Sequence, residues 1–109
     1  MGALVPLPLL PRVLVAASRD DLPLIQTMLG ERYQVRPAAS GAEALALLAR
    51  EAFDLALLDA HAPQNEGFAI LAQIRASARL ACLPVILIVA AEDVARGLHM
   101  GASDCLSRP

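Results

Sequence analysis

Three apolar segments that lack polar alternation constrain the fold of this 109-residue chain more than any other feature. They span residues 12–16, 54–59 and 84–90 and read RVLVA, DLALLD and PVILIVA. A strand with one face in water alternates apolar and polar residues, whereas a strand covered on both faces is apolar nearly throughout. The three segments are therefore predicted to be buried strands of a parallel sheet.

Helical patterns separate these strands. Residues 19–30 carry an apolar face that ends at Gly30, a typical helix stop. Ser40 and Glu43 have the spacing of a capping box, which predicts a helix over 42–51. Further helices are expected over 66–77 and 92–100. The positions predicted to face the core are Leu22, Ile25, Met28 and Leu29 in the first helix, and Phe68, Leu71, Ala72 and Ile74 in the third.

With short strands at 33–37 and 104–107, the predicted order is β-α-β-α-β-α-β-α-β. This alternation predicts an α/β fold, a doubly wound five-stranded parallel sheet with helices on both faces. Ligands bind such sheets beyond the carboxyl ends of the strands. Asp59 ends the third predicted strand, so its carboxylate is expected at that edge.

Composition narrows the function classes. A net charge of -2, three aromatic residues and the lack of a basic block argue against direct nucleic-acid binding. No apolar run is long enough for a membrane span, and the first residues lack a basic leader, which predicts a cytoplasmic protein. Residues 1–11 are expected to be a loose lead-in to one domain over 12–109. Cys82 and Cys105 are predicted to be buried free thiols, since they lack disulfide or metal spacing.

Two motifs resemble the receiver domains of two-component response regulators. Asp59, Pro63 and Gly67 in DAHAPQNEG are similar to the phosphoacceptor segment, and GASDCLSRP at 101–109 is similar to the family's ending, which carries an aromatic residue and a Lys-Pro pair. The resemblance extends over residues 12–109. It implies a CheY-like, flavodoxin-like fold.

The same resemblance implies a pocket that this chain does not complete. Family members hold Mg²⁺ with an acidic pair after the first strand and the phosphoacceptor aspartate; a hydroxyl on the fourth strand and a lysine on the fifth line the pocket. An aromatic residue on the fifth strand reports phosphorylation. Ala17 and Ser18 stand at the acidic pair, Val89 at the hydroxyl, Cys105 at the aromatic residue and Arg108 at the lysine.

These departures lead to a preferred hypothesis and an alternative. The preferred one is a degenerate receiver, a non-enzymatic interaction module of phosphorelay or transcriptional signalling, with no cofactor and at best weak Mg²⁺ binding by Asp59, the His61 carbonyl and water. Its partner would be a signalling protein, a histidine kinase or a phosphotransfer domain. The alternative is a phosphorylatable receiver in which Asp59 attacks a phosphohistidine and Arg108 neutralises the phosphoryl charge. In a third interpretation, an ion pair between Asp59 and Arg108 is only a structural lock.

Other interpretations of the acidic and histidine residues stay open. Asp20 and Asp21 could replace the acidic pair, although Ser18 and Asp21 fit a helix cap better. DAHAPQ approximates a cobalamin-binding signature with His61 as the cobalt ligand, but Gln64 stands where that signature needs glycine. His99 is a lone histidine for which a surface role is expected.

The chain ends where receivers continue into a fifth helix. Either it is a fragment of a longer protein, or another subunit, as in a homodimer, covers the apolar face that this helix would cover.

Overall fold

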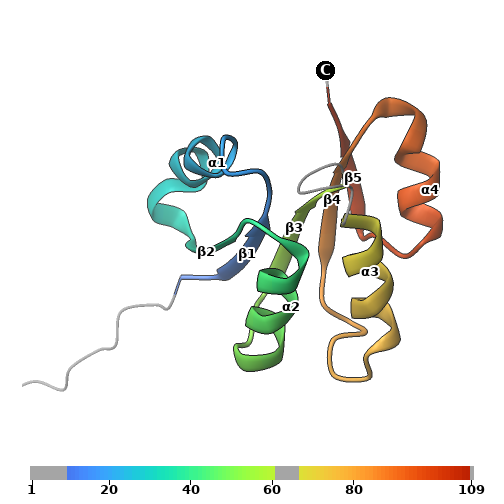
Figure 1. The fold of residues 1–109 in the computed structure, drawn as a ribbon, viewed down its shortest axis with the longest axis horizontal. Helices are drawn as coiled ribbons and strands as arrows, with labels where there is room; N and C mark the ends of the chain where they lie inside the picture. Colours follow the sequence, from blue (N-terminus) through green and yellow to red (C-terminus); the bar gives the residue numbers. More distant parts are fainter. Residues whose placement is uncertain (1–9, 61–66, 109) are drawn as a thin grey trace, which may run out of the picture.

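The computed structural model describes residues 10–60 and 67–108, which form one parallel sheet with helices on both faces (Figure 1). The sheet order is β2-β1-β3-β4-β5, with every neighbouring pair parallel. This order confirms the predicted doubly wound, flavodoxin-like architecture. The strands are β1 (Arg12–Ala16), β2 (Gln34–Ala38), β3 (Leu55–Asp59), β4 (Val85–Val89) and β5 (Asp104–Ser107).

The helices lie where the sequence pattern predicts them, with ends that differ by one to three residues. They are α1 (Leu22–Leu29), α2 (Gly41–Arg50), α3 (Gly67–Ala76) and α4 (Val94–His99), with 3-10 turns η1 (Gly30–Arg32) and η2 (Ala91–Asp93). The predicted capping at Ser40 is confirmed, because its hydroxyl accepts a hydrogen bond from the Glu43 N–H at 3.1 Å. The Glu43 carboxylate accepts in turn from the Ala39 N–H, one residue before the cap.

Side-chain alternation along the strands divides the core between the two faces. On one face, Leu14 of β1 and Leu58 of β3 pack in the larger cluster with residues of α2 and α3. On the other face, Val13 and Val15 pack with Leu22 of α1. The central strands β1, β3 and β4 are therefore apolar along most of their length because both of their faces pack against protein, whereas the edge strands β2 and β5 carry exposed polar residues.

Three predicted core positions are wrong. Met28 is 75% exposed, because α1 turns only a narrow stripe toward β1 and β2. In α3, Ile70 is buried while Ala72 is exposed, so the buried stripe is shifted around the helix. Cys82 is exposed in the turn before β4, and Cys105 is only partly buried. The prediction that Cys82 is buried is wrong because apolar neighbours in the sequence do not decide which way a side chain in a turn points.

The face that carries α1 is less completely covered toward β4 and β5. Leu57, Ile86 and Ile88 are partly exposed there, and Leu106 is 51% exposed. No helix among the described residues has the length and apolar character needed to span a bilayer.

Candidate phosphoacceptor site

Asp59 is the last residue of β3 and lies at the carboxyl edge of the sheet, as predicted. Its side chain is 1% exposed, and it is the one charged residue buried within the described part of the chain. In the strand register Asp59 lies opposite Ile88 of β4, and the next residue, Ala60, donates its N–H to the Ile88 carbonyl at 2.9 Å. The sheet therefore fixes the backbone on both sides of this carboxylate.

Arg108 forms an ion pair with Asp59 through its terminal Nη2 and the aspartate Oδ2. The Arg108 N–H donates to the Val89 carbonyl at 2.8 Å, which extends the β4–β5 pairing past the end of β5 and aims the side chain along this edge. The guanidinium remains 40% exposed while the carboxylate is buried beneath it. The ion pair considered from the sequence is thus present.

Asp21 is a second carboxylate beside this guanidinium, and the sequence interpretation did not pair it with Arg108. Its Oδ2 lies 3.8 Å from the same Nη2. Arg108 lies two residues after Leu106, and Asp59 lies two residues after Leu57. Since side chains two residues apart on a strand point to the same face, both charged residues lie on the α1 side of the sheet. Because Asp21 immediately precedes α1, strand parity indicates that it lies on the same side of the sheet as Arg108, but the contact itself follows only from the tertiary structure.

The two positions at which the family carries its acidic pair hold no carboxylate. Ala17 is fully buried and packs with Val15 and Leu22. Because Ala16 lies opposite Leu58, Ala17 comes level with Asp59. Ser18 accepts a hydrogen bond from the Asp21 N–H at 3.2 Å, so its hydroxyl takes part in the turn before α1; the residue that caps α1 is Asp21, which makes no side-chain cap hydrogen bond, so the capping interpretation holds only for this one contact. Asp20 is exposed.

The remaining pocket positions are apolar or small. Val89 is fully buried at the end of β4. Cys105 lies beneath α4, where a Cβ built on Gly97 would be 2.7 Å from the Cys105 Sγ. Burial raises the pKa of the Cys105 thiol, and the neighbouring Asp104 carboxylate adds to the effect.

Gly67 is the residue of the phosphoacceptor motif for which the geometry gives the clearest structural role. A Cβ at this position would lie 2.5 Å from the Ala60 Cα and 2.6 Å from the Asp59 carbonyl oxygen. Only glycine lets the start of α3 approach the end of β3 this closely. The other motif residues, His61, Pro63 and Gln64, lie outside the described residues, so the proposed metal-ligand and cobalt-ligand roles of His61 remain untested. His99 is exposed on α4, as expected.

The comparisons with known proteins agree with this geometry. The family model of the response regulator receiver domain matches residues 14–109. The chain belongs to this family. Receiver domains act with histidine kinases and phosphotransfer proteins in two-component signalling, and this chain is such a receiver domain.

The chain is similar to parts of longer response-regulator proteins. It is 37% identical over 101 residues to the transcriptional regulatory protein GltR of Pseudomonas aeruginosa, covering 89% of this chain and 42% of that protein. It is 38% identical over 82 residues to the response regulator PleD of Caulobacter vibrioides, covering 72% of this chain and 18% of PleD. The chain thus spans less than half the length of these relatives.

Solved receiver structures share its fold. The signal receiver domain of a histidine kinase from Syntrophus aciditrophicus superposes with a TM-score of 0.81 at 28% identity, covering 91% of this chain and 79% of that one. The chemotaxis response regulator CheY4 of Vibrio cholerae also gives 0.81, at 26% identity, covering 92% and 88%. These matches favour the receiver interpretation over the cobalamin-type alternative.

Proposed function

We propose that this receiver domain works without phosphorylation of Asp59, as a protein-interaction module of bacterial-type signalling. The observation that carries the proposal is the ion pair between Asp59 and Arg108. The cation that neutralises the aspartate is a covalently attached guanidinium, which does not diffuse away and whose planar donors suit a carboxylate.

Among the described residues, the side chains around Asp59 do not fit a receiver-type Mg²⁺ site. Magnesium prefers octahedral ligation by oxygen, whereas Ala17 offers a methyl group beside Asp59 and the Ser18 hydroxyl is occupied by the Asp21 N–H. Among residues 10–60 and 67–108, no three His, Cys, Asp or Glu side chains lie close enough together to hold a metal. The proposed function therefore uses no metal ion.

The alternative keeps Asp59 as a phosphoacceptor. One observation favours it: Arg108 already stands beside the Asp59 oxygen, where it could neutralise charge on a phosphoryl group. The cost is that Arg108 must leave the carboxylate before that oxygen can act as a nucleophile. This cost, together with the lack of carboxylates at Ala17 and Ser18, supports the phosphorylation-independent function.

A titration monitored by two-dimensional NMR separates the two functions. Labelled protein is mixed with Mg²⁺ and then with beryllofluoride, a mimic of the phosphoryl group. We expect no saturable shifts at Asp59, Val89 or Arg108. The matched control is the triple variant Ala17→Asp, Ser18→Asp, Arg108→Lys, which restores the acidic pair and the lysine of the family and should respond. Saturable shifts in the unmodified protein would establish the alternative instead.

A further inference from the structure

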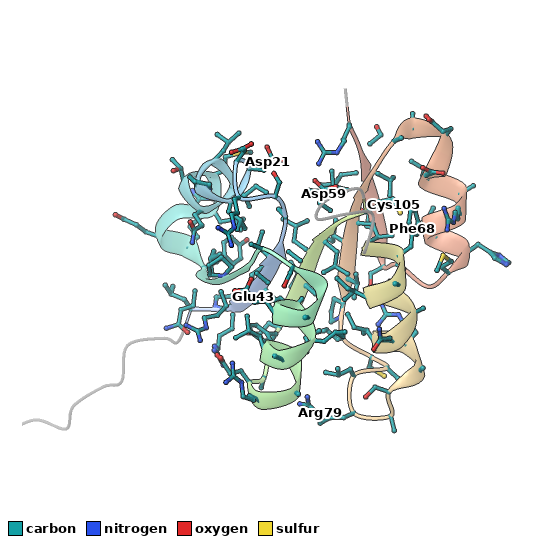
Figure 2. All side chains as sticks on the ribbon, in the orientation of Figure 1. Asp21, Glu43, Asp59, Phe68, Arg79 and Cys105 are labelled. Atoms are coloured by element: carbon teal, nitrogen blue, oxygen red, sulfur yellow. The ribbon has the colours of Figure 1, made fainter. Side chains whose placement is uncertain are left out.

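The amino-terminal end of the sheet, opposite Asp59, carries a second set of chemically distinctive side chains. Two hollows of about 540 and 500 Å³ lie there; Glu51 lines the first, and the next three residues of the chain, 52–54, line the second. We call this surface the amino rim; its defining residues are Arg12, Gln34, Arg36, Glu51, Phe53 and Arg79. Figure 2 shows Arg79 at the bottom of the view, well below Asp59. We propose that the amino rim binds an acidic peptide segment of a partner protein through its arginines and Phe53.

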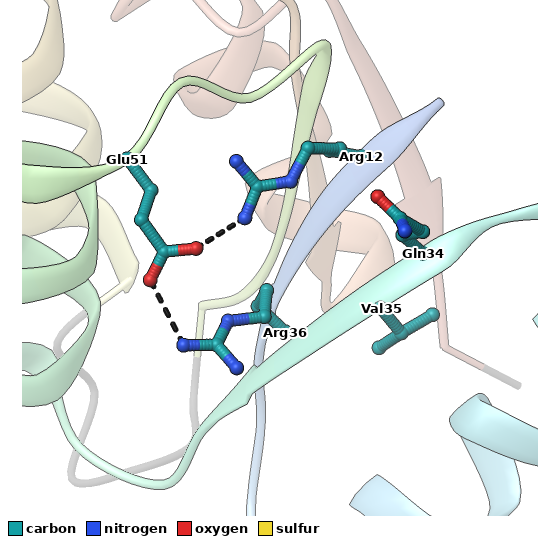
Figure 3. A pocket seen from close by; sticks show the side chains of 5 residues that line it. All are labelled: Arg12, Gln34, Val35, Arg36 and Glu51. Atoms are coloured by element: carbon teal, nitrogen blue, oxygen red, sulfur yellow. Dashed lines mark hydrogen bonds and ion pairs between the residues drawn. The ribbon is translucent and has the colours of Figure 1, made fainter. Parts of the chain in front are cut away.

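The first hollow presents two guanidiniums to one carboxylate. Arg12 and Arg36 both pair with Glu51, Arg36 at 2.9 Å (Figure 3). These two contacts hold the Glu51 pKa below its usual value, with the Arg36 hydrogen bond the larger cause, so the carboxylate stays ionised at neutral pH. The arrangement shows that this position favours a carboxylate, and Glu51 occupies only part of the donor set.

Arg12 is the anchored member of the pair. Its Nη1 donates to the Ala52 carbonyl at 2.9 Å, and its guanidinium carbon lies 5.1 Å from the centre of the Phe53 ring. Arg36 is on the edge strand β2 with its side chain 49% exposed. Arg36 is therefore the guanidinium that an incoming carboxylate can reach.

The second hollow is more apolar and continues from the Phe53 ring. Phe53, Leu80 and Pro84 line it together with Arg79, whose guanidinium donates to the Leu48 carbonyl. An apolar side chain would bury against these groups while a flanking carboxylate meets Arg79. Arginine and aromatic residues around a hollow are also the types that contribute most to binding at protein interfaces.

The charge of the rim selects the partner. The amino rim carries three guanidiniums, from Arg12, Arg36 and Arg79, and two carboxylates, from Glu51 and Asp54. Both carboxylates already accept bonds from the protein itself, Asp54 from the Arg12 N–H at 2.8 Å. The amino rim therefore has an excess of positive charge, although the net charge of the chain is -2. This excess favours a peptide in which carboxylates flank one apolar side chain.

The inference rests on the proposed function only in that the domain signals through protein contacts. The rim and Asp59 lie at the two ends of β3, a separation of about 13 Å at the usual rise of a strand. Binding at the rim therefore leaves the Asp59–Arg108 pair in place. If the beryllofluoride titration shows that Asp59 is a phosphoacceptor, the proposed function fails but the peptide experiment still tests the amino rim. If the peptide does not bind, the proposal for the amino rim fails but the proposed function does not.

The test uses a fluorescent peptide in which glutamates flank one leucine, with fluorescence anisotropy for affinity and NMR shifts for location. We expect saturable binding, shifts confined to residues 34–36, 51–54 and 79–84, and loss of binding when glutamines replace the glutamates. Arg36→Gln should weaken affinity by about two- to five-fold, the upper part of the range for one exposed charge pair. Arg19→Gln removes the same charge from an exposed loop at the other end of β1 and should change nothing.

Glu51→Gln provides a test in the opposite direction. It removes the internal carboxylate that competes for both arginines, so peptide binding should tighten. Weaker binding by Glu51→Gln, equal losses in Arg36→Gln and Arg19→Gln, shifts centred on Asp59, or no saturation by the acidic peptide would each overturn the proposal. Dispersed spectra of each variant verify that it is folded.

Discussion

Arg108, at the end of β5, covers the buried carboxylate of Asp59, at the end of β3, and its guanidinium also lies 3.8 Å from Asp21 before α1. One side chain therefore joins the carboxyl edge of the sheet to the entry of a helix. A buried carboxylate that loses its cation is strongly destabilising, whereas removal of both charges costs much less.

Arg108→Met should lower the free energy of unfolding by about 2 kcal/mol, because Asp59 is left buried without its cation. Urea denaturation at neutral pH measures this loss. The double variant Arg108→Met, Asp59→Asn should recover much of it. A double variant as unstable as the single one would show that Arg108 acts through packing and not through charge.

Gly67→Ala should destabilise the fold by about 3 kcal/mol or more, since its Cβ would overlap the backbone of Ala60, which cannot move without disturbing β3. Thermal and urea unfolding both report the effect. Ala69→Ser, at an exposed position of the same helix, serves as the control and should stay within about 0.5 kcal/mol of the unmodified protein. A soluble, equally stable Gly67→Ala variant would contradict the close approach of α3 to β3.

The Glu51 cluster should make stability pH-dependent in the acidic range. The pKa of Glu51 in the folded protein is lowered by Arg36 and then by Arg12, so the contribution of Glu51 to stability is fully present above its usual pKa of 4.5 and is lost as pH falls through the lower pKa of the folded state. The stability difference between the unmodified protein and Glu51→Gln should therefore shrink as pH drops below about 4.5. A difference that grows on acidification would mean that the arginines do not stabilise the ionised form.

The two thiols should react at different rates with a disulfide reagent at mildly alkaline pH. Cys82 is exposed, whereas Cys105 is partly buried and has a raised pKa, which lowers both its access and its thiolate fraction. Cys82→Ser should remove the fast phase and leave the slow one. If the fast phase instead disappears in Cys105→Ser, the burial of Cys105 beneath α4 is wrong.

Local sequence pattern was sufficient for the elements and the architecture. Uniformly apolar strands read as buried because a parallel sheet is covered on both faces, and Ser40 with Glu43 marked a helix start because capping is made within a few residues. Asp59 was placed correctly at the carboxyl edge for the same reason, since the end of an apolar run is the end of a strand.

Contacts between distant segments needed the tertiary structure. The exposure of Met28, Ala72 and Cys82 depends on how each helix or turn is rotated against the sheet, which a periodic pattern specifies only to within part of a turn. Nothing near Asp21 in the sequence indicates Arg108. The amino rim likewise joins β1, β2 and the turns before β3 and β4, which are far apart along the chain. The sequence determined where strands and helices form because those preferences act over a few residues. Only the folded sheet, by setting strand order and side-chain parity, decided which charged groups meet.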